Sequence, residues 1–206
     1  MFRVYEEVCI GCGICRTECP NQAIEIKNKI AVLAPGAHCM SCGHCVAICP
    51  FNAVWQEGLD MSDVIPVTLS EAALKPNELL RAIKGRRSIR RFRTQQVERE
   101  KFEAMLEAAR FTPSGSNRQG LSFVVVQDDI KNFTRLTIEA LRRLGERLLS
   151  EGETDSLLRF YAPRFVELAR QYEESDGAQD GLFFNAPAVI AVVGTRTIDA
   201  GLAASN

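Results

Sequence analysis

The sequence carries almost no net charge and contains no long hydrophobic run. With a net charge of −1 at pH 7, the chain has no electrostatic basis for binding nucleic acid or an anionic membrane. No apolar run approaches the ~20 residues that a membrane-spanning helix needs. The first residues, 1–7, lack the apolar segment of a signal peptide. We therefore expect a cytoplasmic protein without nucleic-acid or membrane partners.

The sequence also lacks the common catalytic motifs. It contains no G-x-S-x-G, no H-E-x-x-H and no phosphate-binding P-loop pattern. Its two histidines, His38 and His44, each precede a cysteine, and a place in a surface loop explains both without a functional role. We predict no catalytic acid–base residue. The chemistry is then left to bound cofactors, which the protein positions and tunes.

What the sequence does have is a pair of cysteine runs. All eight cysteines fall in segments 9–20 and 39–50, and both segments follow the spacing C-x₂-C-x₂-C-x₃-C-P. Three thiolates two residues apart on a tight loop can surround one face of a metal cluster. Disulfides suit an oxidising compartment and do not repeat this spacing, and structural zinc commonly uses two C-x-x-C pairs. The spacing therefore favours iron–sulfur clusters over both alternatives and over uncommitted buried thiols.

Residues 1–56 resemble bacterial ferredoxins that hold two [4Fe–4S] clusters. The resemblance implies a ferredoxin-like βαβ pseudo-repeat, with a strand over 23–26, a turn and a second strand over 30–33. Apolar burial alone cannot stabilise so small a module, so we expect cluster binding and folding to be coupled. The resemblance also implies that the fourth cysteine of each run ligates the other cluster. The first cluster would then have the ligands Cys9, Cys12, Cys15 and Cys49, and the second Cys39, Cys42, Cys45 and Cys19.

A linker is expected over residues 57–76, followed by a short helix over 76–85 that begins with a proline and ends with a glycine. Segment 86–93 then contains five arginines. Such a run is usually a solvated face or a nucleic-acid patch. This run is an isolated basic segment in a near-neutral chain and lacks a series of aromatic platforms. A phosphate monoester is the alternative partner, because guanidinium groups bind its oxygens in pairs.

The remaining elements predict a mixed helix-and-strand domain. An amphipathic helix is expected over 97–110, a polar loop over 112–119 and a buried strand over 121–127. Helices follow over about 128–148 and 157–172, separated by a polar break at 151–155, and Pro163 should kink or split the second of them. A loop over 176–181 and a core strand over 188–193 complete the pattern.

Residues 78–206 resemble the nitroreductase family of FMN-dependent oxidoreductases. The resemblance rests on Arg86-x-Ser88-x-Arg90, on the run 113–119 (P-S-G-S-N-R-Q), on the strand after it and on 185–190 (N-A-P-A-V-I). It implies an α+β domain over 77–206 that binds FMN and forms a homodimer. The alternative is a capped helix and a polar loop in an unrelated α+β domain. The implied cofactor-binding residues are Arg86, Arg87, Ser88 and Arg90 near the phosphate, ribityl chain and pyrimidine edge, and Pro113, Ser114, Gly115, Asn117 and Gln119, from the partner subunit, near the ring.

Residues 199–206 resemble the opening of the long central helix of that family, which normally continues beyond this point. We therefore expect a chain that lacks the C-terminal part of the domain. The leading hypothesis is an oxidoreductase that passes single electrons from the clusters to FMN for two-electron reduction of a nitro, quinone or similar acceptor, with a redox partner protein as one source of electrons. The alternative is an iron–sulfur electron carrier or binding protein without catalysis of its own.

Overall fold

The computed structural model describes residues 1–151 and 155–205, so part of the predicted polar break (152–154) lies outside the described residues. The chain divides into two compact units. The first contains Met1–Lys84 and Pro113–Gln119, and the second contains Gly85–Thr112 and Gly120–Asn206. Among the described residues, no helix is both long and apolar enough to cross a membrane.

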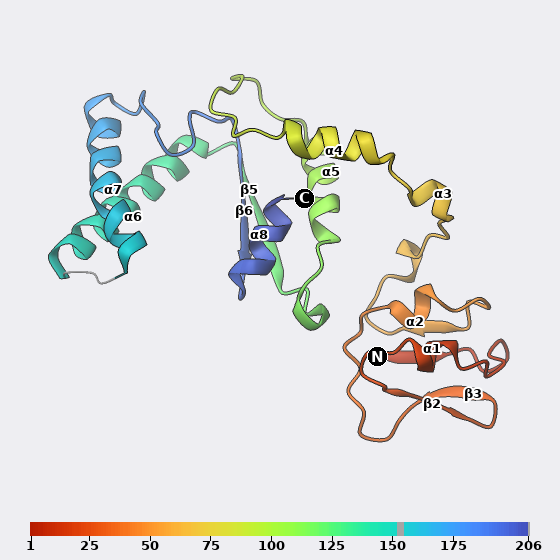
Figure 1. The fold of residues 1–206 in the computed structure, drawn as a ribbon. Coiled ribbons are helices and arrows are strands. Elements are labelled where there is room, and N and C mark those ends of the chain that lie inside the picture. Colours follow the sequence, from red (N-terminus) through yellow and green to blue (C-terminus); the bar gives the residue numbers. More distant parts are fainter. Residues whose placement is uncertain (152–154, 206) are drawn as a thin grey trace. The chain divides into compact units, whose positions relative to one another are not determined.

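The first unit contains two β-α-β halves in succession (Figure 1). Strand β1 pairs antiparallel with β4, with Phe2 opposite Gln56, and β2 pairs antiparallel with β3, with Ile24 opposite Leu33. Asn28 and Lys29 make the turn between β2 and β3 with φ of 51° and 64°. The predicted pseudo-repeat and hairpin are confirmed. The elements are β1 (Phe2–Val4), α1 (Ile14–Thr17), β2 (Ile24–Lys27), β3 (Ile30–Leu33), α2 (His44–Ala47) and β4 (Val54–Gln56).

The buried core of this unit is small and includes thiols. Its apolar members come from all four strands and from α2, and Cys15 and Cys45 are buried among them. The other cysteines of the core edge, such as Cys9 and Cys49, are partly buried. Because this core contains few large apolar side chains, the cysteine sulfur atoms, together with any group bound to them, form part of its packing. The buried apolar residues are Phe2, Ile24, Ala31, Val46 and Val54.

Short helices follow the dicluster repeat. They are η1 (Met61–Asp63), α3 (Leu69–Ala72) and α4 (Pro76–Gly85), and a further turn, η2 (Gly115–Asn117), lies in the loop that groups with this unit. Thr68 and Glu71 form a reciprocal capping box at the start of α3. The predicted helix over 76–85 is confirmed. A proline in its first turn and a glycine at its end define its limits.

The second unit is built from one antiparallel pair of strands and four helices among its described residues, which confirms the α+β class. Leu121 lies opposite Gly194 at one end of the pair, and Val126 lies opposite Val189 at the other. Helix α5 starts two residues later than predicted, at Arg99. The elements are α5 (Arg99–Arg110), β5 (Leu121–Val126), α6 (Ile130–Glu151), α7 (Ser156–Glu174), β6 (Val189–Gly194) and α8 (Thr197–Ser205).

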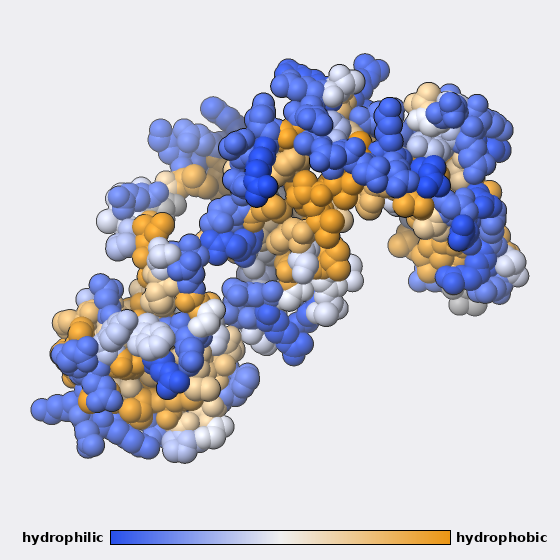
Figure 2. All heavy atoms as spheres, turned by 180° about the vertical axis from the view of Figure 1, so that it is seen from behind, coloured by the Kyte–Doolittle hydropathy of each residue, from blue (hydrophilic) through white to orange (hydrophobic). Residues whose placement is uncertain are grey.

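The two strands were predicted to be buried, and this prediction is wrong for the described chain. Val124 is 49% exposed and Val193 is 56% exposed. Both lie on one face of the ladder, since neighbouring residues of a strand point to opposite faces. The other face, with Phe123 and Val192, lines a cavity together with α5 and α8. Figure 2 shows hydrophobic surface, in orange, over this part of the chain.

Pro163 was predicted to kink or split its helix, and the structure shows that it does not split it. Helix α7 runs from Ser156 to Glu174 with Pro163 inside it. Beside the proline, Ala162 is 1% exposed, and a Cβ atom on Gly145 of α6 would come within 2.7 Å of the Ala162 carbonyl oxygen. Helix α6 thus packs closely against α7 beside the proline, whose ring removes one backbone hydrogen bond.

Candidate functional site

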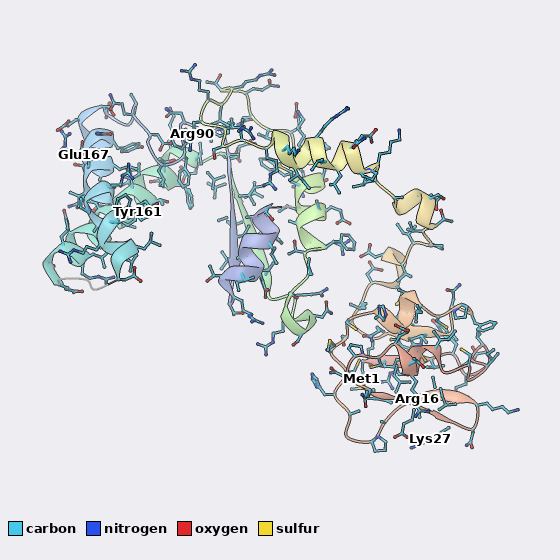
Figure 3. The ribbon with its side chains drawn as sticks, in the orientation of Figure 1. Met1, Arg16, Lys27, Arg90, Tyr161 and Glu167 are labelled. Atoms are coloured by element: carbon cyan, nitrogen blue, oxygen red, sulfur yellow. The ribbon has the colours of Figure 1, made fainter. Side chains whose placement is uncertain are left out.

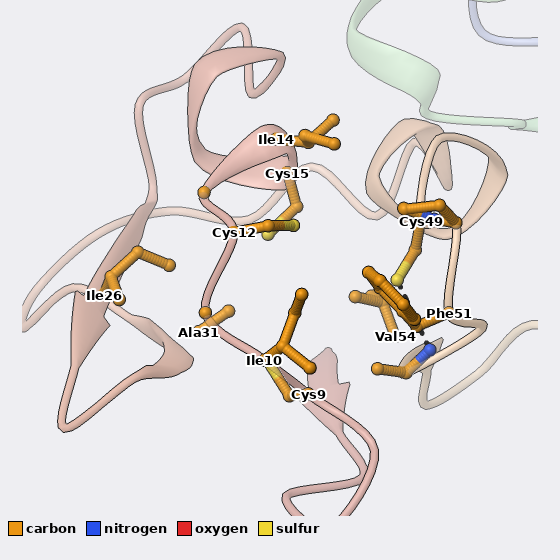
Figure 4. A pocket seen from close by; sticks show the side chains of 14 residues that line it. Cys9, Ile10, Cys12, Ile14, Cys15, Ile26, Ala31, Cys49, Phe51 and Val54 are labelled. Carbon is orange, nitrogen blue, oxygen red and sulfur yellow. Dashed lines mark hydrogen bonds between the residues drawn. The ribbon is translucent and has the colours of Figure 1, made fainter.

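Four cysteines line a first cavity in the dicluster unit. Cys9 and Cys12 lie in the loop before α1, Cys15 lies in α1, and Cys49 follows α2 (Figure 4). Gly13 starts α1 with a φ of 80°, which directs the chain from the loop into the helix between the second and third thiols. Apart from the cysteines, the side chains around the cavity are hydrophobic. They include Ile10, Ile14, Ile26, Phe51 and Val54.

The second cavity repeats this arrangement. Cys39, Cys42 and Cys45 come from the second run, and Cys19 comes from the end of the first. Each cavity therefore gathers three thiols of one run and the last thiol of the other, which are the two sets named from the sequence. The walls of the second cavity are hydrophobic apart from a few polar residues. They include Phe2, Ile24, Leu33, Met40, Asn21, His44 and Gln56.

Nitrogen–hydrogen groups point at several of these sulfur atoms. The backbone N–H of Ala23 donates to Cys19 Sγ at 3.3 Å, and that of Ala53 donates to Cys49 Sγ at the same distance. The side chain of Gln56 donates from Nε2 to the sulfurs of Cys39 at 3.6 Å and Cys45 at 3.9 Å. The sequence reasoning missed Gln56, since a glutamine at a strand end is unremarkable unless it is aligned with its counterpart in the repeat.

Burial opposes ionisation of the inner thiols. Burial, with the neighbouring Cys45 as the next cause, raises the pKa of Cys15 to about 11. Burial also raises the pKa of Cys45, although the Gln56 amide acts against it. Burial acts to raise the pKa of Cys39 too, but hydrogen bonds from Ser41, Gln56 and the Phe2 backbone outweigh it and lower this pKa. Thiolates at the buried positions need nearby positive charge, which metal ions supply.

The donor set of each cavity fits an iron–sulfur cluster. All eight cysteines are free of disulfides. Within residues 1–151 and 155–205, no group of three or more histidine, cysteine or carboxylate side chains is arranged to hold a single metal ion. Four thiols around hydrophobic walls, with N–H groups directed at the sulfurs, are the surroundings in which such clusters are held and tuned.

The arginine segment lies in the second unit, and one of its residues reaches a cavity. The cavity has a volume of about 410 Å³ and is lined by α5, β5, β6 and α8. Arg86 lines this cavity, and its Nη1 atom donates to the carbonyl oxygen of Ser205 at 2.8 Å. A guanidinium has five N–H donors, so this bond leaves others for an anion. One cation beside hydrophobic walls suits a ligand in which a chain joins an aromatic ring to a phosphate, and FMN is such a ligand.

The other predicted cofactor-binding residues of the arginine segment, Arg87, Ser88 and Arg90, do not line this cavity. Arg87 donates from Nη1 to the carbonyl oxygen of Arg86 at 2.7 Å, and Ser88 is exposed. The guanidinium of Arg90 lies over the ring of Phe184, 5.8 Å from the ring centroid. Figure 3 labels Arg90 in the segment between α4 and α5. Among these four predicted residues, Arg86 alone lines the cavity of the second unit.

The predicted ring-binding loop groups with the first unit instead. Within it, the Gln119 backbone N–H donates to Ser114 Oγ at 2.9 Å, and Asn117 has a φ of 51°. Asn117 donates from Nδ2 to the carbonyl oxygen of Ser41, in the second cysteine run, at 2.8 Å. The loop, which also contains Pro113 and Gly115, is therefore not brought to the arginines within either unit. The family resemblance assigns this loop to the flavin of the partner subunit, so a single chain need not join the two sets.

Residues 8–53 match the 4Fe-4S dicluster domain, and residues 83–205 match the nitroreductase family. A component of the ion-translocating oxidoreductase complex of Methanosarcina acetivorans is 45% identical over 51 residues, which are 25% of this chain and 19% of that protein. Mouse iodotyrosine deiodinase 1 is 29% identical over 109 residues, which are 47% of this chain and 38% of that protein.

A solved structure of a nitroreductase with bound FMN from Bacteroides fragilis is 22% identical, with a TM-score of 0.41 over 62% of this chain and 60% of that chain. The chain thus spans less than two thirds of each of these three proteins. The match to the nitroreductase family nevertheless covers more than half of the chain. The chain therefore belongs to the nitroreductase family and carries a 4Fe-4S dicluster domain ahead of its nitroreductase domain.

Proposed function

We propose that this chain is an electron-transfer oxidoreductase in which two [4Fe–4S] clusters deliver electrons to FMN for the two-electron reduction of a small-molecule acceptor. The observation that carries the proposal is the pair of four-cysteine cavities on the same chain as a nitroreductase domain. FMN accepts electrons singly and releases them in pairs, which matches a supply of single electrons to a two-electron reaction. A nitro compound or a quinone is an acceptor of this kind.

In this proposal each cavity holds one cluster. The grouping of the thiols supports ligation of the first cluster by Cys9, Cys12, Cys15 and Cys49, and of the second by Cys39, Cys42, Cys45 and Cys19. The Ala23 and Ala53 amides would stabilise the negative charge on the two crossed ligands. Free thiols and clusters of this type persist in a reducing compartment, so we place the protein in the cytoplasm.

Arg86 would bind the phosphate of FMN, and Ser88 and Arg90 would contact the cofactor from the same segment. This assignment is supported by the position of Arg86 at a hydrophobic cavity within the nitroreductase domain. The residues of loop 113–119 would border the ring in a homodimer. We keep the division into a dicluster module over 1–56, a linker over 57–76 and a flavin domain over 77–206 as part of the proposal.

The proposed ring-binding loop contacts the second cysteine run. Within the first unit, the side chain of Asn117 is bonded to Ser41, which directly precedes Cys42. The loop proposed to border the flavin ring is thus held against the cysteine run of the second cluster.

An anaerobic experiment tests the proposal. The chain is reconstituted with iron, sulfide and FMN, and a reduced one-electron donor is added in less than stoichiometric amounts while cluster and flavin absorbance are followed. We expect the cluster band to bleach first and the flavin band to follow. The Cys42→Ala variant, which lacks one ligand of the second cluster, should transfer electrons to FMN much more slowly. Reduced clusters beside flavin that stays oxidised would refute the proposal and leave an iron–sulfur carrier without catalysis.

A further inference from the structure

Among the positions at which the two halves of the dicluster domain differ, two replace a residue without a side-chain donor in the first half by a residue with one in the second. The repeat aligns 19–26 with 49–56, so Ile26 of the first half corresponds to Gln56 of the second. Ile26 lines the first cavity and Gln56 lines the second. The repeat also aligns Gly11 with Ser41, each of which directly precedes the second cysteine of its run. The alkyl side chain of Ile26 thus corresponds to the amide of Gln56, and the hydrogen of Gly11 corresponds to the hydroxyl-bearing side chain of Ser41.

Gln56 is held in place at the second cavity. The residue is 1% exposed, and its backbone is fixed in β4 opposite Phe2. The Nε2 atom donates to the sulfurs of both Cys39 and Cys45. The Oε1 atom is buried and has no hydrogen-bond partner among the described residues. Burial of a half-satisfied amide is unfavourable, so a glutamine here is explained by what its N–H groups do at the sulfurs.

The first half has no room for the equivalent of Ser41. A Cβ atom on Gly11 would lie 2.5 Å from the carbonyl oxygen of Lys29, so this position accepts no side chain without a backbone shift. In the second half, the equivalent position carries a hydroxyl group, on Ser41. Together with the Gln56 amide, it gives the second half side-chain donors that the first half lacks at these positions. The corresponding side chains of the first half, at Gly11 and Ile26, have no polar hydrogen to donate.

We propose that Gln56, together with Ser41, makes the second cluster easier to reduce than the first and so directs an electron from the first cluster to the second. Reduction adds one negative charge to a cluster, and hydrogen bonds to the ligand sulfurs stabilise that charge. In this step one electron leaves the first cluster and the same electron reaches the second, and no bond is made or broken. The inference rests on the two clusters of the proposed function and does not depend on the flavin.

Two reciprocal substitutions, Gln56→Ile and Ile26→Gln, test the inference. Gln56→Ile removes the amide from the second cavity and gives this position the residue of the first half. It should shift the electron equilibrium toward the first cluster by roughly tenfold or more, which is about 59 mV for a one-electron couple. Ile26→Gln brings an amide to the first cavity and should shift the same equilibrium in the same direction by raising the potential of the first cluster. Ser41→Gly should shift the second potential in the direction of Gln56→Ile.

The measurement is potentiometry of the anaerobically reconstituted full chain, with the reduced clusters followed by electron paramagnetic resonance. The expected result is that Gln56→Ile and Ser41→Gly lower one potential and Ile26→Gln raises the other. Unchanged potentials, or equal shifts of both clusters in each variant, would overturn the inference. If the Gln56→Ile variant fails to assemble its second cluster, the cluster potentials of the Ile26→Gln and Ser41→Gly variants decide whether the inference holds. This experiment does not measure flavin reduction. If the clusters fail to reduce FMN in the experiment of the proposed function, that function is refuted and the cluster potentials measured here still stand. If the unsubstituted chain assembles no clusters, both the proposed function and this inference are refuted.

Discussion

The Gly11→Ala substitution should selectively damage the first cluster site. Gly11 has a φ of +69°, and a Cβ atom there would lie 2.5 Å from the carbonyl oxygen and 2.8 Å from the Cα atom of Lys29. The left-handed backbone costs a side chain about 1–2 kcal/mol. The overlap with the Lys29 backbone, which cannot rotate away as a side chain can, adds about 1–3 kcal/mol. The two contributions together predict a loss of about 2–5 kcal/mol.

Gly36 provides a matched control in the same unit. Its φ is +73°, close to that of Gly11, but no atom lies within 4 Å of the position that a Cβ would take. The Gly36→Ala variant should therefore lose only the backbone contribution of about 1–2 kcal/mol. The difference between the two variants isolates the contact of the first cysteine loop with the turn between β2 and β3.

The assay is anaerobic reconstitution followed by measurement of iron and acid-labile sulfide per chain, and of the temperature at which the cluster absorbance is lost. Gly36→Ala should retain both clusters. Gly11→Ala should retain mainly the second cluster and lose absorbance at a clearly lower temperature. Equal cluster content and equal thermal loss in the two variants would show that the Lys29 contact does not shape the first site.

Three further predictions concern other parts of the chain. Cys19→Ala should remove the second cluster before the first in spectra of the reconstituted protein, and the opposite order would overturn the crossed ligation. Arg86→Ala removes charge-assisted hydrogen bonds worth about 1.5–3 kcal/mol. FMN binding measured by fluorescence should then weaken roughly ten- to a hundredfold, with a smaller loss for riboflavin, which lacks the phosphate, and equal losses for both ligands would exclude a phosphate contact. Gly145→Ala should destabilise the second unit by about 1–3 kcal/mol in thermal unfolding because of the 2.7 Å approach to Ala162, whereas Gly201→Ala, with open space around it, should be neutral or stabilising by up to about 1 kcal/mol.

The sequence predicts the local elements well where chain-breaking residues mark them. Pro76 and Gly85 define the two ends of α4, and the turn-forming Asn28 and Lys29 separate β2 from β3. In these segments the local backbone preference and the final structure agree, because proline and glycine restrict or permit the same dihedral angles in any context. The cysteine spacing likewise indicates that the first three thiols of each run lie together, since covalent geometry limits the distances along a tight loop. The grouping of Cys19 and Cys49 with the other run follows from the ferredoxin resemblance instead.

Burial could not be predicted in the same way. The apolar run over β5 indicates a strand, but apolarity does not say which element covers each face. Val124 and Phe123 are adjacent in sequence, and they point to opposite faces of the ladder, of which one borders the cavity and the other is exposed. The unbroken α7 has a similar explanation. Pro163 disfavours a helix locally, and the packing of α6 on Ala162 is a tertiary contact that the local sequence does not encode.

The repeat of the first unit keeps what cluster ligation needs and varies what can distinguish the two clusters. Both halves retain the cysteine spacing and an alanine whose N–H donates to the last cysteine of the run, Ala23 to Cys19 and Ala53 to Cys49. They differ where Ile26 is replaced by Gln56, at equivalent positions of the two halves. Two identical sites would share an electron equally. An unequal pair gives the electron a preferred position, and in this chain the extra donors lie at the site whose cysteine run also contacts the loop of Asn117. A small set of polar side chains can therefore set the order in which the two clusters hold the electron.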